Sequence, residues 1–281
     1  MPLEIFLMVL GSALLHATWN AMVKSGSDRP GVIRAFCATQ LTLSLCLVPF
    51  VGLPDAASWP YLLGSAVVST GYWLLLNRAY DTGELSLVYP LARGMAPLVV
   101  AFVSVGFLGE HLSRPSLIGV VLIALGILSL ALTRGAAGLR DLRTVGMALA
   151  TGGLIGGYTL LDGLGVRAAG NTAGYVVWVQ MVAGLMAIAT LHWRPPAGRV
   201  TLNGRTLRAG ILSGAIGYLC SWIVLWAFTQ APIALVSALR ETGIVFAVII
   251  GVVFLKERLS LARLASIATT LVGTTILKVS R

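Results

Sequence analysis

Charged residues are scarce in this sequence of 281 residues, in which Asp, Glu, Lys and Arg together reach 11%. A soluble domain carries about 25% charged residues, because its surface has to be largely polar. Here apolar residues make up 57%, and the mean hydropathy is +0.91. The few charges cluster and leave uncharged runs such as 117–133, which with their flanks reach the roughly 20 residues that cross a bilayer. The composition excludes a soluble domain and predicts a protein that crosses the membrane several times.

Cysteine is scarce as well. Cys37, Cys46 and Cys220 all fall inside apolar segments, and their spacing suits neither a zinc site nor a disulfide framework, so we interpret them as packing residues. The sequence also lacks the GxSxG and HExxH patterns of hydrolases and the GxxxxGK[ST] loop that binds ATP phosphates. These absences argue against an intramembrane enzyme and against an ATP-driven pump. We predict neither a cofactor nor a metal site.

The apolar runs are continuous, whereas the strands of a membrane barrel alternate polar and apolar residues. Helices are the other way to satisfy backbone hydrogen bonds in lipid. The predicted fold class is therefore an all-α polytopic membrane protein. Breaks rich in charges or turn residues divide the chain into ten predicted transmembrane helices: Leu3–Val23, Val32–Leu53, Trp59–Tyr80, Leu85–Gly109, Leu117–Thr133, Thr144–Gly165, Asn171–His192, Leu207–Phe228, Ile233–Leu255 and Leu261–Leu277.

One short phrase occurs twice. Residues 107–113 read FLGEHLS and residues 254–260 read FLKERLS, with five of the seven positions identical, and the match extends back to Arg93 and Arg240. The repeat divides one transmembrane domain into two halves, 1–137 and 138–281, with five predicted helices each. Because five is odd, the second half enters the membrane upside down. Such inverted-topology repeats are typical of secondary transporters, which bind substrate between the halves.

The formal net charge of +10 reflects basic residues in the short connections between apolar segments, so we predict no nucleic-acid partner. Fourteen Lys and Arg residues fall in connections on one side of the predicted topology and four on the other, with Arg93 and Arg240 inside the membrane. Since basic residues concentrate on the cytoplasmic side, this distribution predicts that both termini lie outside the cytoplasm.

The two FLxExLS phrases, the stretch HATWNAMVK at residues 16–24 and the arrangement of five plus five helices resemble the ten-helix, EamA-type branch of the drug/metabolite transporter superfamily. The aromatic amino-acid exporter group is the most similar part of that branch. The resemblance implies a bacterial inner-membrane protein that exports amino acids or related metabolites without ATP. It also implies cytoplasmic termini, which conflicts with the distribution of Lys and Arg.

Polar residues inside membrane helices are costly and often mark a substrate pathway. Side chains three or four positions apart share a helix face. On this basis we predict substrate-binding residues in both halves: His16, Trp19, Asn20, Trp73, Asn77, Tyr80, Tyr89, Arg93, Tyr158, Asp162, Trp178, Tyr218, Trp222, Arg240 and Glu241. Several have a structural alternative: hydrogen bonding between helices for His16 and Asn20, anchoring at the membrane surface for Tyr80, and pairing with neighbouring helices for Arg240 and Glu241.

The fourth predicted helix contains YPLARGMAP, in which Pro90 and Pro97 each lack a backbone donor. We predict that these prolines, together with Pro232 in the second half, break helices as binding sites of transporters require. Arg93 would then bind the carboxylate of an amino acid. The alternative is that Arg93 extends to the membrane surface.

Glu110 and Glu257, in the two repeated phrases, are predicted to be structural and to satisfy helix ends.

The sequence thus predicts a secondary transporter with a central cavity, a small-molecule substrate and the lipid bilayer as its partners, functional as a monomer. Two alternatives stay open. One is an exporter of hydrophobic cationic drugs by proton antiport through Asp162 or Glu241, and the other is a solute channel.

Overall fold

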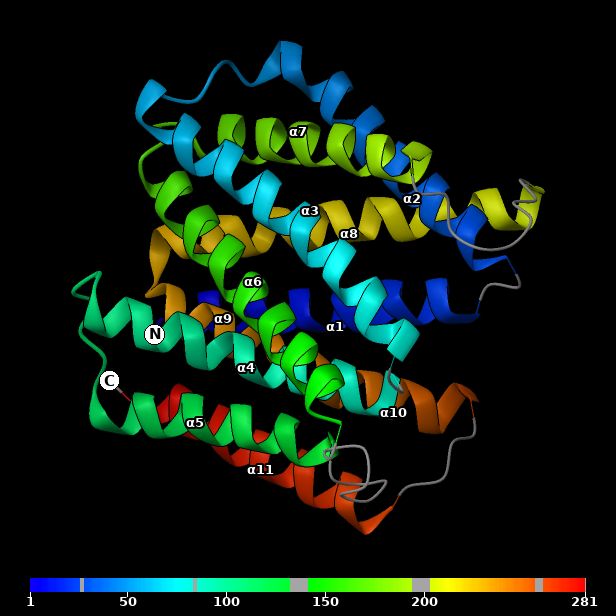
Figure 1. Cartoon of the computed structure of the whole chain (residues 1–281). Helices are drawn as coiled ribbons and strands as arrows, with labels where there is room; N and C mark the ends of the chain where they lie inside the picture. Colours follow the sequence, from blue (N-terminus) through cyan, green and yellow to red (C-terminus); the bar gives the residue numbers. More distant parts are fainter. Residues whose placement is uncertain (26–27, 83–84, 132–140, 194–202, 256–259, 281) are drawn as a thin grey trace.

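The computed structural model of the chain describes residues 1–25, 28–82, 85–131, 141–193, 203–255 and 260–280. The described residues form ten helical spans, and the ninth consists of two helices (Figure 1). The helices are α1 (Leu3–Ser25), α2 (Arg29–Leu47), α3 (Trp59–Thr82), α4 (Leu85–Gly106), α5 (Arg114–Ser129), α6 (Leu142–Arg167), α7 (Thr172–Trp193), α8 (Gly204–Gln230), α9 (Ile233–Glu241), α10 (Gly243–Leu255) and α11 (Leu261–Val279).

Length and composition alone qualify 8 segments of the described chain as membrane spans, with α9 and most of α10 counted as one. Helix α5, with 16 residues, is apolar but shorter, and α3, with 24 residues, is the tenth span and is not among the 8. The prediction of an all-helical membrane protein is confirmed.

Side-chain caps fix where several helices begin. Ser113 Oγ accepts a hydrogen bond from the Ser116 amide (3.3 Å) before α5, and Ser260 Oγ accepts one from the Arg263 amide (3.3 Å) before α11. Both serines end the repeated FLxExLS phrase, and serine is a preferred residue at this position because its side chain replaces a missing helix partner. The repeat therefore encodes the same helix start in both halves.

The predicted helix break at Pro90 and Pro97 is wrong, because α4 runs unbroken from Leu85 to Gly106 through both prolines. Each proline removes one backbone hydrogen bond, and α4 packs against α5 and α6 on either side. Neighbouring helices allow membrane helices to keep prolines in this way. Pro232 does not interrupt a helix either, since it directly precedes the first residue of α9.

The break lies instead at Thr242, between α9 and α10, where no proline occurs. The Thr242 amide and hydroxyl both donate to the Leu239 carbonyl, at 3.1 and 2.7 Å, which tightens the last turn of α9. Gly243 follows, and a Cβ there would lie 3.0 Å from the Ala13 carbonyl oxygen of α1. The close approach of α1 thus requires a glycine at the start of α10.

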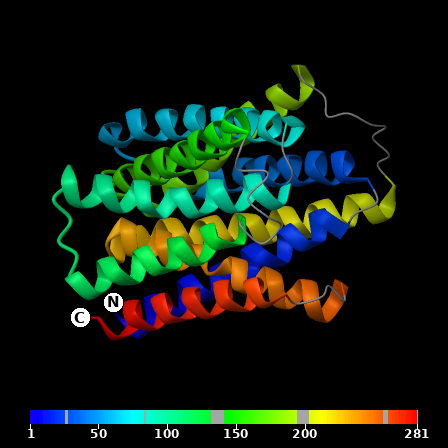
Figure 2. The same ribbon diagram turned by 60° about the horizontal axis from the view of Figure 1, so that its bottom comes forward.

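The first helix of each half packs against the other half. Helix α1 lies against α8, α9 and α10, while α6 lies against α3 and α4. The last helices, α5 and α11, lie side by side at the edge of the bundle (Figures 1 and 2). Ser12 of α1 donates a hydrogen bond to the Cys220 carbonyl of α8 (3.2 Å). The two halves are therefore interlocked, and the N- and C-termini lie at the same end of the bundle.

Glycines bring several of these helix pairs into close contact. A Cβ at Gly152 of α6 would lie 2.6 Å from the Ala92 carbonyl oxygen of α4, and one at Gly119 of α5 would lie 2.9 Å from the Gly273 carbonyl oxygen of α11. Small residues at such contacts let backbones approach, and the resulting close packing contributes to helix association in lipid.

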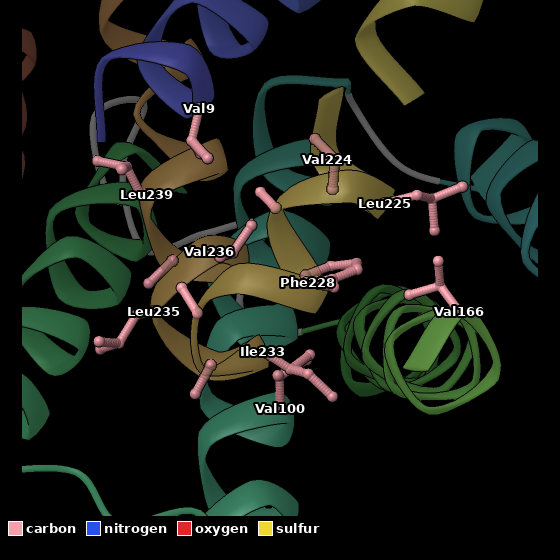
Figure 3. Packing of buried hydrophobic residues seen from close by; sticks show 14 of the residues in the cluster. Val9, Val100, Val166, Val224, Leu225, Phe228, Ile233, Leu235, Val236 and Leu239 are labelled. Atoms are coloured by element: carbon pink, nitrogen blue, oxygen red, sulfur yellow. The ribbon is translucent and has the colours of Figure 1, made fainter. Parts of the chain in front are cut away.

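Apolar side chains pack around α9, at the end of the bundle that holds both chain termini. All residues from Ile233 to Leu239 are buried, and Phe228, Val100 and Val9 from α8, α4 and α1 pack around them (Figure 3). A helix that is apolar on every side belongs at the centre of a protein. Helix α9 therefore ends in the interior, and its last two residues are Arg240 and Glu241.

Candidate functional site

Four ionisable side chains meet where α9 ends, and we call His16, Arg93, Arg240 and Glu241 the central cluster. His16 comes from α1, Arg93 from α4, and Arg240 and Glu241 from the last turn of α9. His16, Arg93 and the break after α9 all lie well inside their spans. The sequence predicted all four residues as candidates, and the structure brings them together from both halves.

Arg93 is held firmly within this cluster. Its Nε lies 2.9 Å from Glu241 Oε2, and the two side chains are only 9% and 2% exposed. Its Nη2 lies 3.2 Å from His16 Nε2. Since a guanidinium can only donate, His16 Nε2 is the acceptor in this hydrogen bond. Arg93 is thus paired with protein groups on two sides.

Arg240 is bound less completely. Its Nε lies 3.9 Å from Glu241 Oε1, beyond hydrogen-bond distance, and no described residue accepts a hydrogen bond from this buried nitrogen. Its side chain is 14% exposed. Glu241 Oε1 is likewise buried without a hydrogen-bond partner among the described residues. The cluster therefore contains one tight ion pair and one guanidinium whose Nε has no hydrogen-bond partner among the described residues.

Aromatic rings surround the cluster. The Arg93 guanidinium lies 5.8 Å from the centre of the Tyr89 ring, and the Trp19 ring lies 5.1 Å from the His16 ring. The Tyr72 and Tyr158 rings are 5.9 Å apart, and Tyr158 is also an electrostatic neighbour of Arg240. Rings placed this way suit a ligand with both apolar and charged parts.

Asp162 lies one helical turn beyond Tyr158 on α6. Its polar neighbours are Ser65 of α3 and Tyr175 of α7, and Arg240 is within electrostatic range of its carboxylate. Its Oδ1 is buried and accepts no hydrogen bond from the part of the chain that the structure describes. Asp162, like Arg240 and Glu241, is thus a buried group with unused hydrogen-bonding capacity.

The sequence repeat explains why only one of the two arginines has a close carboxylate partner. Arg93 and Arg240 occupy equivalent positions in the two halves. The two arginines are as far apart in the sequence as Glu110 and Glu257, the glutamates of the repeated phrase. The residue after Arg240 is Glu241, but the residue after Arg93 is Gly94. The arginine is therefore duplicated while the glutamate is not, and a single Glu241 faces both arginines.

A second set of polar side chains lies at the end of the bundle that holds both chain termini. Glu110 Oε1 accepts a hydrogen bond from the Ile233 amide (3.0 Å) at the start of α9 and lies 2.9 Å from Arg167 Nη1. Arg167 also donates to the Phe228 and Ala231 carbonyls at the end of α8, at 2.8 and 2.9 Å. Glu110 thus satisfies a helix end of the opposite half, while Glu257 lies outside the described residues.

For the other predicted site residues, the described contacts do not include the side chains of the central cluster. Trp73 is 41% exposed and Asn77 is exposed, both on α3, and the Tyr80 side chain is outside the described part of the structure. Trp178 contacts Trp59 edge to face at 5.4 Å, near the start of α3. The Asn20 amide donates to the His16 carbonyl of its own helix (2.8 Å).

The remaining pair, Tyr218 and Trp222 on α8, is occupied by packing. Ser44 of α2 donates a hydrogen bond to the Tyr218 hydroxyl (3.3 Å), and Trp222 packs partly buried against the apolar core. Their rings are 6.2 Å apart. These contacts join α2 and α8 and do not include the central cluster.

Sequence reasoning missed four residues that complete these groups: Ser65, Tyr72, Tyr175 and Arg167. A single tyrosine or serine in an apolar helix carries no signal of what it faces. Arg167 had a weak signal, since it is a basic residue at a helix end, where it can bind unsatisfied carbonyls. Among the described residues no three His, Cys, Asp or Glu side chains come together as a metal site requires.

Comparison with known proteins agrees with this architecture. Two uncharacterized proteins match part of the chain: one from Methanocaldococcus jannaschii is 38% identical over 81 residues, 29% of this chain and 58% of that protein. The other, from Sinorhizobium fredii, is 34% identical over 85 residues, 30% of this chain and 73% of that protein. This chain thus spans little more than half of the first relative. A crystal structure of another protein superposes with a TM-score of 0.77 over 98% of both chains at 18% identity, which shows the fold alone.

The halves are also recognised separately. The model of the EamA-like transporter family matches residues 3–132 and, a second time, residues 142–279. The chain therefore belongs to the EamA-like transporter family, whose members are membrane transporters and not enzymes.

Proposed function

We propose that this transporter exports amino acids or related small metabolites across the bacterial inner membrane by alternating access, with its substrate bound at the central cluster. The carrying observation is that α1, α4 and α9 place charged groups of both halves against one another deep in the bundle. Such groups are costly in a membrane interior and are a hallmark of substrate pathways. Two inverted halves that share one central site support alternating access.

The arrangement of charges favours amino acids over hydrophobic cations. A cation exporter needs a buried acid that is free to bind the drug or a proton. Glu241 is engaged by Arg93 at 2.9 Å and faces Arg240 as well. Asp162 also keeps a buried oxygen without a hydrogen-bond partner in the described structure and, unlike Glu241, is not shown in a tight ion pair, so it carries the second candidate function, proton-coupled export of cationic drugs.

Transport by the purified protein tests the proposal. The full chain, reconstituted as a monomer in liposomes preloaded with unlabelled amino acids, should exchange them for radiolabelled ones faster than protein-free liposomes do. Arg93→Ala should lose this exchange. Arg208→Gln, which changes an exposed residue of α8, should keep it.

No exchange of any amino acid by correctly folded protein would contradict the proposal. Uptake of a lipophilic cation that depends on a pH gradient, and that Asp162→Asn abolishes, would establish the second function in its place. A solute flux that does not saturate as the solute concentration rises, together with no exchange, would indicate a channel.

A further inference from the structure

The charged groups of the site differ in how many hydrogen-bond and ion-pair partners they have within the protein. Arg93 binds Glu241 and His16 and has protein partners on two sides. A substrate carboxylate at Arg93 would have to displace one of them. Arg240 Nε and Asp162 Oδ1 are buried and have no hydrogen-bond partner among the described residues. Buried polar groups without partners are uncommon in native proteins, and a ligand that supplies the partner removes the cost.

These two groups carry opposite charges and are near each other. Arg240 is within electrostatic range of Asp162, and Tyr158, one turn before Asp162 on α6, borders Arg240. Helices α6 and α9 are in contact, so the three side chains lie in the same part of the bundle. The Tyr72 ring, 5.9 Å from the Tyr158 ring, adds an apolar wall there.

The total charge of the region narrows the class of ligand. Arg93 and Arg240 contribute two positive charges, and the carboxylates of Glu241 and Asp162 balance them when Asp162 is ionised, as it would be opposite an ammonium group. His16 Nε2 accepts a hydrogen bond, which requires the neutral imidazole. A balanced site gains nothing from a ligand with net positive or net negative charge, because either would leave a buried charge unpaired. It does suit a ligand whose charges are separated but sum to zero.

We propose that Arg240 binds the carboxylate and Asp162 binds the ammonium group of a zwitterionic substrate, an α-amino acid. Arg93 and Glu241 hold the end of α9 in place and do not contact the charged groups of the substrate. The assignment rests on the transport function proposed above. It differs from the sequence-based expectation, in which Arg93 bound the carboxylate.

The proposal predicts a crossed pattern of specificity. The probes are L-phenylalanine, L-phenylalaninamide and N-acetyl-L-phenylalanine, with the same three forms of leucine and threonine. The amide lacks the carboxylate, and the acetylated form lacks the ammonium group. A buried charged hydrogen bond that is lost reduces affinity roughly tenfold to a hundredfold. The unmodified protein should therefore bind the free amino acid more tightly than either analogue by about this factor.

Arg240→Gln should abolish the preference over the amide and keep the preference over the acetylated form. Asp162→Asn should do the opposite. Binding is measured as the ligand-induced rise of the unfolding temperature of the full-length protein in detergent, and exchange is measured in liposomes. Arg240→Lys, which retains the charge, should restore part of the preference over the amide, and Arg208→Gln should leave all preferences unchanged.

The outcomes separate the two proposals. If both variants bind all probes equally weakly, or if their preferences are unchanged, the assignment of Arg240 and Asp162 is overturned and the transport proposal is not affected. Crossed preferences in binding without any exchange would overturn the transport proposal and support the assignment. Failure of the unmodified protein to bind any free amino acid would overturn the assignment, and flux of other solutes would then decide on transport.

Discussion

At the scale of single residues, Arg93 and Glu241 stabilise each other at a depth where neither could stay charged alone. A buried ion pair adds little stability compared with apolar residues, but removal of one partner leaves the other charge unpaired at a cost of about 3–5 kcal/mol. Their exposed fractions of 9% and 2% place the pair in this regime. Arg240, whose Nε is 3.9 Å from Glu241 Oε1, compensates only in part.

We therefore expect Arg93→Ala to lower the free energy of unfolding by about 3 kcal/mol, because Glu241 loses its close partner. The double variant Arg93→Met with Glu241→Gln should recover part of this loss, since it removes both partners of the tight pair and only Arg240 then loses a neighbouring charge. Unfolding by denaturing detergent in mixed micelles measures both. A single variant as stable as the unmodified protein would contradict the ion pair, and Arg208→Ala serves as the control.

The residues of the site could be predicted from the sequence only as a list. A charged side chain in an apolar helix is visible in the sequence, so His16, Arg93, Arg240 and Glu241 were identified. Which partner each one binds depends on how helices from different halves pack, and no local pattern encodes this. Trp73 and Trp178 were selected by the same reasoning, and their described contacts do not include the side chains of the central cluster.

At the scale of helices, glycine positions determine how closely two helices approach. Gly152 and Gly153 are adjacent on α6 but differ in their surroundings. A Cβ at Gly152 would lie 2.6 Å from the Ala92 carbonyl oxygen and 2.7 Å from Met95 Cβ of α4, whereas nothing lies within 4 Å of a Cβ at Gly153. The contact between α4 and α6 therefore depends on Gly152 and not on its neighbour.

Gly152→Ala should destabilise the protein by roughly 1–3 kcal/mol, because overpacking moves the backbone of α4. Gly153→Ala should leave stability unchanged or raise it by up to about 1 kcal/mol, since alanine favours the helix. The same unfolding measurement compares the two substitutions in one background. Equal effects would show that α4 and α6 do not approach as closely as described.

Helix positions follow from the sequence because long apolar runs in lipid have no alternative to the helix. The break at Thr242 could not be foreseen in this way. Prolines were used as the signal for a break, but Pro90 and Pro97 are accommodated within α4. The actual break depends on the approach of α1 to Gly243, which is a tertiary contact.

At the scale of the whole molecule, the ten spans place both termini at one end of the bundle (Figure 1). Basic residues at that end of the described chain are Arg114, Arg167 and Lys278. The opposite end carries Lys24, Arg29, Arg34, Arg78, Arg143, Arg205, Arg208 and Arg263. The asymmetry found in the sequence thus corresponds to two ends of one folded bundle.

Since basic residues mark the cytoplasmic side, we expect both termini outside the cytoplasm. Single cysteines introduced at Pro2 and Ser280, in a variant without Cys37, Cys46 and Cys220, should react with a membrane-impermeant thiol reagent in intact cells. A cysteine at Arg208 should react only after the cells are opened. The reverse pattern would agree with the family's usual orientation, and different sides for the two termini would contradict the fold.

The packing of α1 against α8, α9 and α10 has a consequence for synthesis. About 180 residues separate the end of α1 from the start of α8, and at roughly 5–20 residues per second the ribosome needs on the order of 10–40 seconds to make them. During this interval Ser12 of α1 is in the membrane without Cys220 of α8, whose carbonyl accepts its hydrogen bond. The face of α1 that packs against α8, α9 and α10 therefore stays uncovered by protein until the second half of the chain has been inserted.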